Sequence, residues 1–237
     1  MSLFQNIKRE NTYADISVQN RKIPFAVVES YKAIRTNLSF LLSSSKSNVV
    51  TITSPNSGEG KSTTAANMAI AFSQLGERVL LIDADMRRAS LHKKLKTDNG
   101  DGLSNILAGM ANVDDCIRKI NDSLFFLPSG RIPPNPSELL GSPAFEKLIN
   151  TVSPLYNCVI IDTPPMSVVS DAVIVAPRTA GIVLVVRDRQ THNDDVKHAI
   201  DSAEFAGIKI LGAVINGIKQ SSGGGSKYYN NRYYIKN

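Results

Sequence analysis

The sequence predicts an α/β domain with a mostly parallel sheet and helices on both faces. Short β-branched runs alternate with helical stretches through the body of the chain, and several of these runs are apolar at nearly every position. Strands that crossover helices bury on both faces have this continuous apolar character. With 237 residues, 42% of them hydrophobic, the chain is long enough to bury a core in one such domain.

Each expected element follows from its own local pattern. The first helix is amphipathic, since apolar residues recur in it at helical spacing, and glycines at 76 and 207 stop two of the later helices. The expected helices are Val27–Leu42, Lys61–Leu75, Ser142–Val152 and Asn193–Phe205. The expected strands are Val49–Ser54, Val79–Asp83, Leu124–Leu127, Val159–Asp162, Ile182–Val186 and Ile210–Ile215.

Positive charge is concentrated at the two ends of the chain. Residues 1–50 carry seven Lys and Arg against three acids, residues 51–218 carry sixteen against eighteen, and residues 219–237 carry four against none. Basic ends attract nucleic acid, anionic lipid or acidic proteins. No nucleic-acid-reading motif accompanies them, so we expect no nucleic-acid partner. The expected division is a basic segment over 1–25, a nucleotide-binding domain over 26–219 and a Gly/Ser linker with a tyrosine-rich tail over 220–237.

No membrane-spanning segment or secretory signal is expected. The longest apolar runs, such as Ile182–Val186, are far shorter than the ~18 residues needed to cross a bilayer. The first ten residues lack the apolar core of a secretory signal. Two cysteines form no disulfide framework, and Cys158 lies in a strand-like run that indicates a buried thiol. These features predict a cytoplasmic protein.

A phosphate-binding loop is predicted between the first strand and the helix that follows it. The segment Pro55-Asn-Ser-Gly-Glu-Gly-Lys-Ser-Thr63 ends in the Gly-Lys-Ser of such loops, although Pro55 stands where the first glycine is usual. Backbone N–H groups and the helix N-terminus would cradle phosphate, Lys61 would reach the terminal phosphates, and Ser62 would bind magnesium. The expected nucleotide-binding residues of the loop are Ser57, Gly58, Glu59, Gly60, Lys61, Ser62 and Thr63. A single P-loop NTPase-like domain is therefore predicted.

Carboxylates follow two further apolar strands. One strand ends in Asp83-Ala-Asp85-Met-Arg87 and the other in Asp162-Thr-Pro-Pro. Ligands of open α/β sheets bind beyond the carboxyl ends of the strands, and magnesium prefers such hard oxygen ligands. ATP and magnesium are accordingly the expected cofactors, and Asp83, Asp85 and Asp162 belong to the expected site.

In combination these motifs resemble a family, the bacterial tyrosine kinases (BY-kinases) that govern capsular and exopolysaccharide synthesis. The family carries a phosphate loop, an Asp-x-Asp-x-Arg motif and an Asp-x-x-Pro motif, which stand here in order at 55–63, 79–87 and 159–165. Two more stretches resemble it: Pro133–Leu140, and Glu29-x-x-Lys32-x-x-Arg35-Thr-Asn37 in the first helix. Lys32 and Ala89 depart from the residues that are commoner there, Arg and Pro.

The resemblance implies an autophosphorylating protein-tyrosine kinase. It implies that Asp83 is the general base for the tyrosine hydroxyl, that Asp85 orders the metal's water shell, and that Ser62 and Asp162 hold magnesium. Arg87 either stabilises charge in the transition state or pairs with a nearby acid. Asn216 either contacts adenine or is a turn residue before Gly217, and Asp171 is expected to be an N-cap. The expected phosphate acceptors are Tyr228, Tyr229, Tyr233 and Tyr234.

Partners are also implied by the resemblance. Glu29, Lys32 and Arg35 lie nearly on one helix face, which the family uses between subunits, and the alternative is a solvated face. A closed homo-oligomeric ring is therefore expected, together with protein substrates phosphorylated on tyrosine. Because we expect no transmembrane module, a separate membrane protein would activate the kinase through a cytosolic segment and recruit it to the inner face of the membrane.

A second function class shares the nucleotide motifs. Partitioning and division-site ATPases of the deviant Walker family act as ATP-dependent switches that bind protein or membrane partners without phosphorylating them. Those proteins carry a signature lysine five residues before the invariant one. That position is Asn56 here, which argues against a dimeric switch.

Overall fold

The structure is a computed structural model that describes residues 24–218. The tail tyrosines lie outside these residues. The expected N-terminal segment, 1–25, also lies outside them except for residues 24 and 25. Within residues 24–218, no helix is both long enough and apolar enough to cross a membrane.

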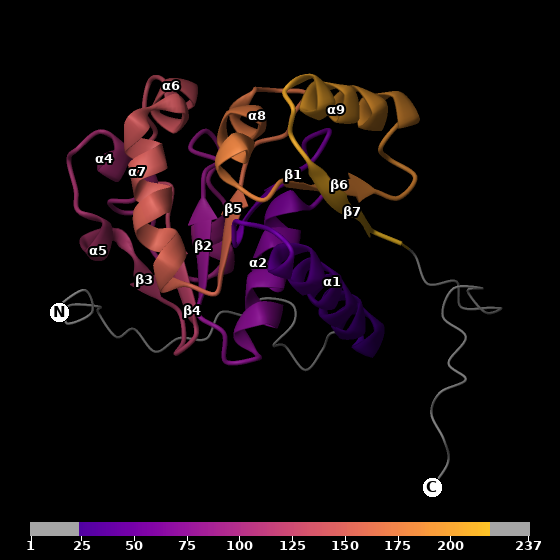
Figure 1. Cartoon of the computed structure of the whole chain (residues 1–237), viewed down its shortest axis with the longest axis horizontal. Coiled ribbons are helices and arrows are strands. Elements are labelled where there is room, and N and C mark those ends of the chain that lie inside the picture. Colours follow the sequence, from indigo (N-terminus) through magenta and orange to yellow (C-terminus); the bar gives the residue numbers. More distant parts are fainter. Residues whose placement is uncertain (1–23, 219–237) are drawn as a thin grey trace, which may run out of the picture.

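A seven-stranded sheet forms the centre of the molecule, in the order β3-β4-β2-β5-β1-β6-β7 (Figure 1). Every neighbouring pair is parallel except β3 and β4, which are antiparallel. The order places β5 between β1 and β2, so the three strands that carry the nucleotide motifs are neighbours. The strands are β1 Val49–Thr53, β2 Val79–Asp83, β3 Arg118–Lys119, β4 Leu124–Leu127, β5 Cys158–Asp162, β6 Ile182–Arg187 and β7 Ile210–Asn216.

Helices cover both faces of this sheet, as the sequence predicts. The longer ones are α1 Phe25–Ser43, α2 Lys61–Ser73, α7 Pro143–Val152 and α9 Asn193–Phe205. The shorter ones are α3 Leu91–Lys94, α4 Leu103–Leu107, α5 Val113–Cys116, α6 Pro136–Gly141 and α8 Asp171–Val175. Two 3₁₀ turns, Ser153–Leu155 and Ala176–Arg178, follow α7 and α8.

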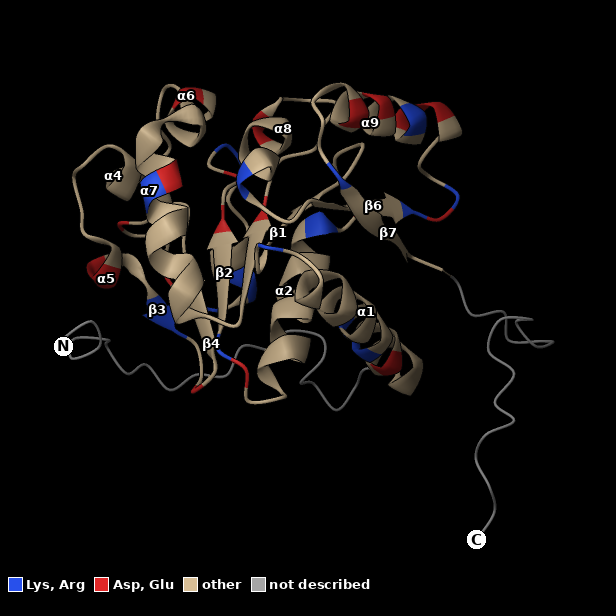
Figure 2. Ribbon diagram, in the orientation of Figure 1, with Lys and Arg blue, Asp and Glu red and all other residues tan. Residues whose placement is uncertain are grey.

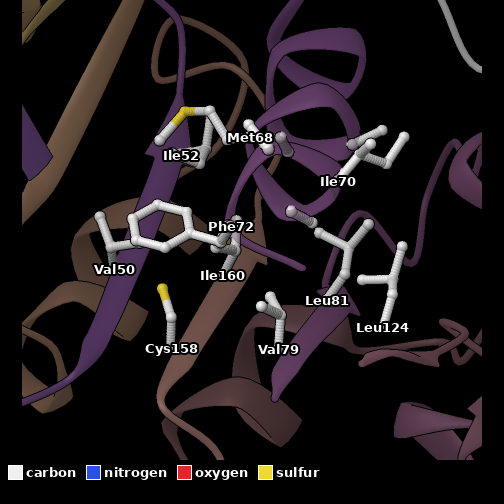
Figure 3. Close-up of a cluster of buried hydrophobic side chains, with 14 of the residues drawn as sticks. Val50, Ile52, Met68, Ile70, Phe72, Val79, Leu81, Leu124, Cys158 and Ile160 are labelled. Atoms are coloured by element: carbon white, nitrogen blue, oxygen red, sulfur yellow. The ribbon is translucent and has the colours of Figure 1, made fainter. Parts of the chain in front are cut away.

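Alternate strand residues pack against the two helical layers, because successive strand side chains point to opposite faces. On one face Val50, Leu81 and Ile160 meet α1 and α2, and Figure 3 shows them beneath Met68 and Phe72 of α2. On the other face Val49 and Ile82 pack against α4 to α8. Residues such as Ile52, Leu80 and Ile161 have no exposed surface, which accounts for strands that read as continuous apolar runs.

All six expected strands and all four expected helices are confirmed, and no boundary differs by more than two residues. The short strand β3 and the helices α3, α4, α5, α6 and α8 were not expected. Helices of four to six residues are too short to show a periodic pattern of their own. The expectation that Asp171 is an N-cap is wrong: Ser170 holds that position, and Asp171 is the first helical residue.

Candidate functional site

The phosphate loop runs from the end of β1 to the first turn of α2. Gly58 and Gly60 have φ angles of 84° and 97°, in the left-handed region that favours glycine. A Cβ at position 60 would also lie 2.0 Å from the side-chain nitrogen of Asn216. Lys61 is the first residue of the 13-residue helix α2, so the helix N-terminus points into the loop. This is the local geometry of an anion-binding loop.

The sheet brings the predicted acids to this loop. Asp83 and Asp162 are register partners on β2 and β5, and Asp162 is the partner of Ile52 on β1. The Lys61 ammonium lies 2.9 Å from a carboxylate oxygen of Asp85, 3.9 Å from Asp162 and 3.2 Å from the Ser62 hydroxyl. Figure 2 shows the acidic ends of β2 and β5 beside the basic start of α2.

Burial sets the electrostatics of these groups. Desolvation, reinforced by the charge of Asp162, raises the pKa of Asp83 to about 8, although the Leu91 amide opposes it. Desolvation also raises the pKa of Asp162 to about 6, with Lys61 acting in the opposite direction. Desolvation alone would lower the pKa of Lys61, but the carboxylates of Asp162 and Asp85 outweigh it and raise that pKa. Lys61 is thus a cation held by surrounding acids.

The residues present fit a magnesium ion. Both carboxylate oxygens of Asp162 are buried and accept no hydrogen bond from the described residues, so Lys61 at 3.9 Å compensates this carboxylate only in part. Ser62 is also buried and lies next to the same lysine. No three acidic, histidine or cysteine side chains in residues 24–218 form a metal site by themselves. Magnesium is commonly held by one or two carboxylates, with water and nucleotide phosphates completing its shell.

The carboxylate of Glu59 is engaged by protein groups on both of its oxygens. It is buried, accepts a 2.6 Å hydrogen bond from the Thr191 hydroxyl and accepts a second one, 2.9 Å long, from the Asn56 amide. Asn56, at the position of the signature lysine, donates a 2.8 Å side-chain hydrogen bond to Asp195 of α9. The loop is therefore fastened to the β6–α9 region within one chain.

Asn216 fastens the same loop from β7. Its side-chain nitrogen donates a 3.0 Å hydrogen bond to the Glu59 carbonyl, and its side-chain oxygen accepts one from the Gly217 amide. In this structure both the nitrogen and the oxygen of the Asn216 side chain bind backbone groups. These contacts are those of a turn residue. Arg187 adds a further contact, with its guanidinium 3.1 Å from the Gly58 carbonyl.

In this structure Arg87 pairs with a nearby acid, which is one of its two expected roles. Its Nε lies 3.5 Å from a carboxylate oxygen of Asp171, and its Nη2 donates a 2.9 Å hydrogen bond to the Ser137 hydroxyl. The arginine side chain is 38% exposed, whereas Asp171 is fully buried.

The three residues expected at a subunit interface do not all face outward. Glu29 and Lys32 form a 2.8 Å ion pair on the exposed side of α1. Arg35 turns toward the core, where its Nη1 donates a 2.8 Å hydrogen bond to the Ala71 carbonyl of α2. In this structure, the outward-facing part of the motif is therefore Glu29 and Lys32.

Four residues around the site were not singled out for these roles by sequence reasoning. Thr191 is a polar loop residue outside every motif, Ser137 lies within the Pro133–Leu140 stretch without an expected role of its own, and Asp171 is expected only as a cap. Lys94 of α3 lies 3.1 Å from the Thr63 hydroxyl, and its charge opposes the rise in the pKa of Asp162. Only the Pro133–Leu140 resemblance pointed toward any of them.

Comparison with known proteins identifies the family. The family model described as "AAA domain" matches residues 47–196. The chain is 40% identical over 202 residues to the tyrosine-protein kinase YwqD of Bacillus subtilis (strain 168), a match that covers 85% of each protein. This chain belongs to the bacterial tyrosine kinases. A second relative of this kinase is the tyrosine-protein kinase CpsD of Streptococcus agalactiae, with 39% identity over 81% of this chain and 84% of CpsD.

Solved structures agree with this assignment. The kinase is similar to the chimerical protein CapA2B2, with 38% identity, a TM-score of 0.80 and coverage of 90% and 93% of the two chains. It is also similar to the kinase domain of Escherichia coli ETK, with 32% identity, a TM-score of 0.83 and coverage of 95% and 89%. Other relatives are much longer: the kinase spans 28% of the putative tyrosine-protein kinase EpsB of Ralstonia nicotianae.

The family belongs to capsular and exopolysaccharide systems, and its P-loop fold uses ATP. The fold extends to the septum site-determining protein MinD from Pyrococcus horikoshii, which was solved with Mg-ADP. That similarity is weaker, with 25% identity and a TM-score of 0.61 over 71% of this chain and 69% of MinD. The kinase assignment, rather than the ATPase switch, follows from the stronger matches.

Proposed function

We propose that this kinase transfers the γ-phosphoryl group of ATP to tyrosines of its own C-terminal segment, Tyr228, Tyr229, Tyr233 and Tyr234. The observation that carries the proposal is the position of Lys61, which lies at the helix N-terminus within 4 Å of Asp85 and Asp162. A lysine in this position exchanges its carboxylate partners for phosphate oxygens when nucleotide enters, and it neutralises charge that develops there.

The phosphate loop would bind the nucleotide through backbone amides of residues 57–63. The loop is held by the hydrogen bonds of Glu59 with the Asn56 amide and the Asn216 side chain. Because its carboxylate is occupied in this way, Glu59 would contribute to nucleotide binding through its backbone amide. Ser62 and Asp162 would hold magnesium, with Asp85 ordering its water. When bound, the metal neutralises phosphate charge and aligns the β- and γ-phosphates.

Asp83 is our candidate acceptor for the tyrosine proton. Tyrosine has an unperturbed pKa of ~10, so its hydroxyl needs a positioned base as it attacks. Asp83 is fully buried, with its two oxygens 3.2 Å from the amides of Asp85 and Leu91. The acceptor tyrosine therefore reaches it only after the segment between these two residues moves. Arg87, at the exposed edge of the same segment, would contact the transferring phosphoryl group.

Assembly and activation belong to the same proposal. A linker of n residues reaches only ~5–6 Å × √n, which favours phosphorylation of a neighbour held by a specific interface. The exposed Glu29–Lys32 pair of α1 is a charged surface for a head-to-tail contact, which closes into a ring. A separate membrane protein would activate the kinase through a cytosolic segment and hold it at the cytoplasmic face of the membrane.

Incubation of the full chain with magnesium and ATP tests the proposal. Phosphotyrosine, located by mass spectrometry, should form on the tail and should be absent in Lys61→Met. Lys147→Met is the matched control, because Lys147 lies exposed on α7 away from the loop, and it should label like the wild type. Equal labelling of Lys61→Met and the wild type would overturn the assignment of the site.

A further inference from the structure

The Pro133–Leu140 stretch is the one motif of the sequence that the proposed chemistry does not use. Its second half forms α6, which begins at Pro136, and a proline fits the first helical position because its φ is already helical. Leu140, at the other end, is fully buried in the cluster that also contains Val175 of α8. The motif thus packs α6 against α8 and places Ser137 one residue after the helix start.

At that place the Ser137 hydroxyl joins two charged groups. It donates a 2.6 Å hydrogen bond to one carboxylate oxygen of Asp171 and accepts a 2.9 Å hydrogen bond from Nη2 of Arg87. Nε of Arg87 lies 3.5 Å from the other oxygen of Asp171. The hydroxyl therefore uses one donor and one acceptor, and the three side chains close a ring of contacts.

Because Asp171 is buried and Arg87 is partly exposed, the aspartate fixes the position of the arginine and not the reverse. Asp171 has no exposed surface, and its Oδ2 accepts no hydrogen bond from the described residues, so its charge depends on Arg87 and Ser137. A buried carboxylate without a cation is strongly unfavourable. The fixed Asp171 thus anchors a partly exposed arginine, whose long side chain would otherwise sample many rotamers at the edge of the site.

We infer that Ser137 and Asp171 are positioning residues that hold Arg87 in place for phosphoryl transfer, and that the Pro133–Leu140 motif serves to deliver Ser137. The inference rests on the proposed function, in which Arg87 contacts the transferring group. Its effect falls on the chemical step, because a guanidinium displaced by about 1 Å stabilises the transition state poorly while the loop still binds ATP.

The arginine is also connected to the phosphate site through its own segment. Asp85, two residues earlier, accepts a 2.9 Å hydrogen bond from the Arg88 amide with one oxygen and contacts Lys61 with the other. A contact that fixes Arg87 therefore limits the movement of the residues that face the phosphates. Ser137 and Asp171 come from the segments that follow β4 and β5, so the network joins three strand ends.

Steady-state kinetics of Ser137→Ala test the inference, with a tyrosine-containing acceptor peptide as substrate. We expect kcat to fall about tenfold while the KM for ATP changes less than twofold. Ser137→Thr retains a hydroxyl and should recover most of kcat. Ser142→Ala is the matched control: its hydroxyl, at the other end of α6, donates a hydrogen bond to the Leu139 carbonyl and not to Arg87 or Asp171, and kcat should stay within twofold of the wild type.

Two further arms separate positioning from loss of stability. In an Arg87→Ala background, Ser137→Ala should cause no additional loss of kcat, since the residue through which it acts is gone. If Arg87→Ala does not fold, Asp171→Asn serves instead, and it should lower kcat with an unchanged melting temperature and an unchanged KM for ATP.

The inference is overturned by any of three results: wild-type kcat in Ser137→Ala, a loss that adds in full to that of Arg87→Ala, or a loss that tracks the melting temperature. These outcomes presuppose a wild type that phosphorylates tyrosine. A wild type without that activity would instead contradict the proposed function.

Discussion

Asp83 and Asp162 are register partners at the carboxyl ends of β2 and β5, and both are fully buried. The charge of Asp162 disfavours the ionisation of Asp83, which adds to the desolvation that raises the pKa of Asp83. Lys61 offsets part of this repulsion, yet the oxygens of Asp162 have no hydrogen-bond partner among residues 24–218. The site therefore holds excess negative charge that a bound cation would relieve.

This relationship predicts that Asp162→Asn stabilises the protein in magnesium-free buffer at pH 8. The pKa of Asp162 is raised to about 6 in the folded protein, so the folded state binds more protons than the unfolded state between about pH 4 and 6. The associated stability is present at low pH and is lost as pH rises through 6. We expect a gain of about 1 to 2 kcal/mol at pH 8 and roughly half of that gain at pH 5, because the unfolded state is already ionised there.

Urea unfolding at the two pH values measures the effect, and Asp201→Asn on the exposed side of α9 is the control. Adding magnesium with ADP should stabilise the wild type more than Asp162→Asn. A variant that is no more stable than the wild type at pH 8 would show that Lys61 already compensates the charge in full.

A second prediction concerns the hydrogen bond between Thr191 and Glu59 of the phosphate loop. Thr191→Val removes the hydroxyl that donates to the buried Glu59 carboxylate, and a buried acceptor left without its donor costs about 1 to 3 kcal/mol. The loop should loosen, and the Kd for ATP, measured by calorimetry, should rise several-fold. Thr191→Ser should bind like the wild type, because it keeps the hydroxyl. An unchanged Kd in Thr191→Val would refute a role of this contact in shaping the loop.

The contacts of α1 lead to a prediction that separates assembly from stability. Glu29→Ala/Lys32→Ala removes an exposed ion pair, which contributes little to stability, so the melting temperature should stay near that of the wild type. Light scattering should nevertheless show monomers if this surface builds the ring.

Arg35→Ala should behave differently. It leaves the Ala71 carbonyl without its donor and should lower the melting temperature, because Arg35 ties α1 to α2. If the double alanine variant keeps the mass of the wild type, the interface does not depend on the exposed pair.

Thiol chemistry offers a test of the core. Cys116 and Cys158 are free and buried, and desolvation raises the pKa of Cys116 to about 11 and the pKa of Cys158 further. The thiolate is the reactive species, so neither residue should react with iodoacetamide at pH 8 within an hour. In 6–8 M urea both should be alkylated, as counted by intact-mass spectrometry. Rapid labelling of the native protein would mean that the fold opens locally, at strand β5 for Cys158 or at helix α5 for Cys116.

Local sequence patterns were enough to predict most of the fold. The continuous apolar character of segments such as Val79–Asp83, and the glycine stop at 207, depend only on neighbouring residues and on burial. The phosphate loop was predictable for the same reason, because Gly60-Lys61-Ser62 needs only a preceding strand and a following helix. By contrast, a two-residue strand such as β3 and a four-residue helix such as α3 have too few residues for a period.

Side-chain partners across the sheet were decided by tertiary structure. Ser137 meets Asp171 and Arg87, which are 34 and 50 residues away, because the strand order brings the ends of β4, β2 and β5 together. The spacing places Arg35 nearly on the face of Glu29, but α2 packs against α1 so that the Arg35 guanidinium donates to the Ala71 carbonyl instead of facing solvent. Such contacts depend on which strands are neighbours and on where the helices pack, and no spacing along the chain encodes them.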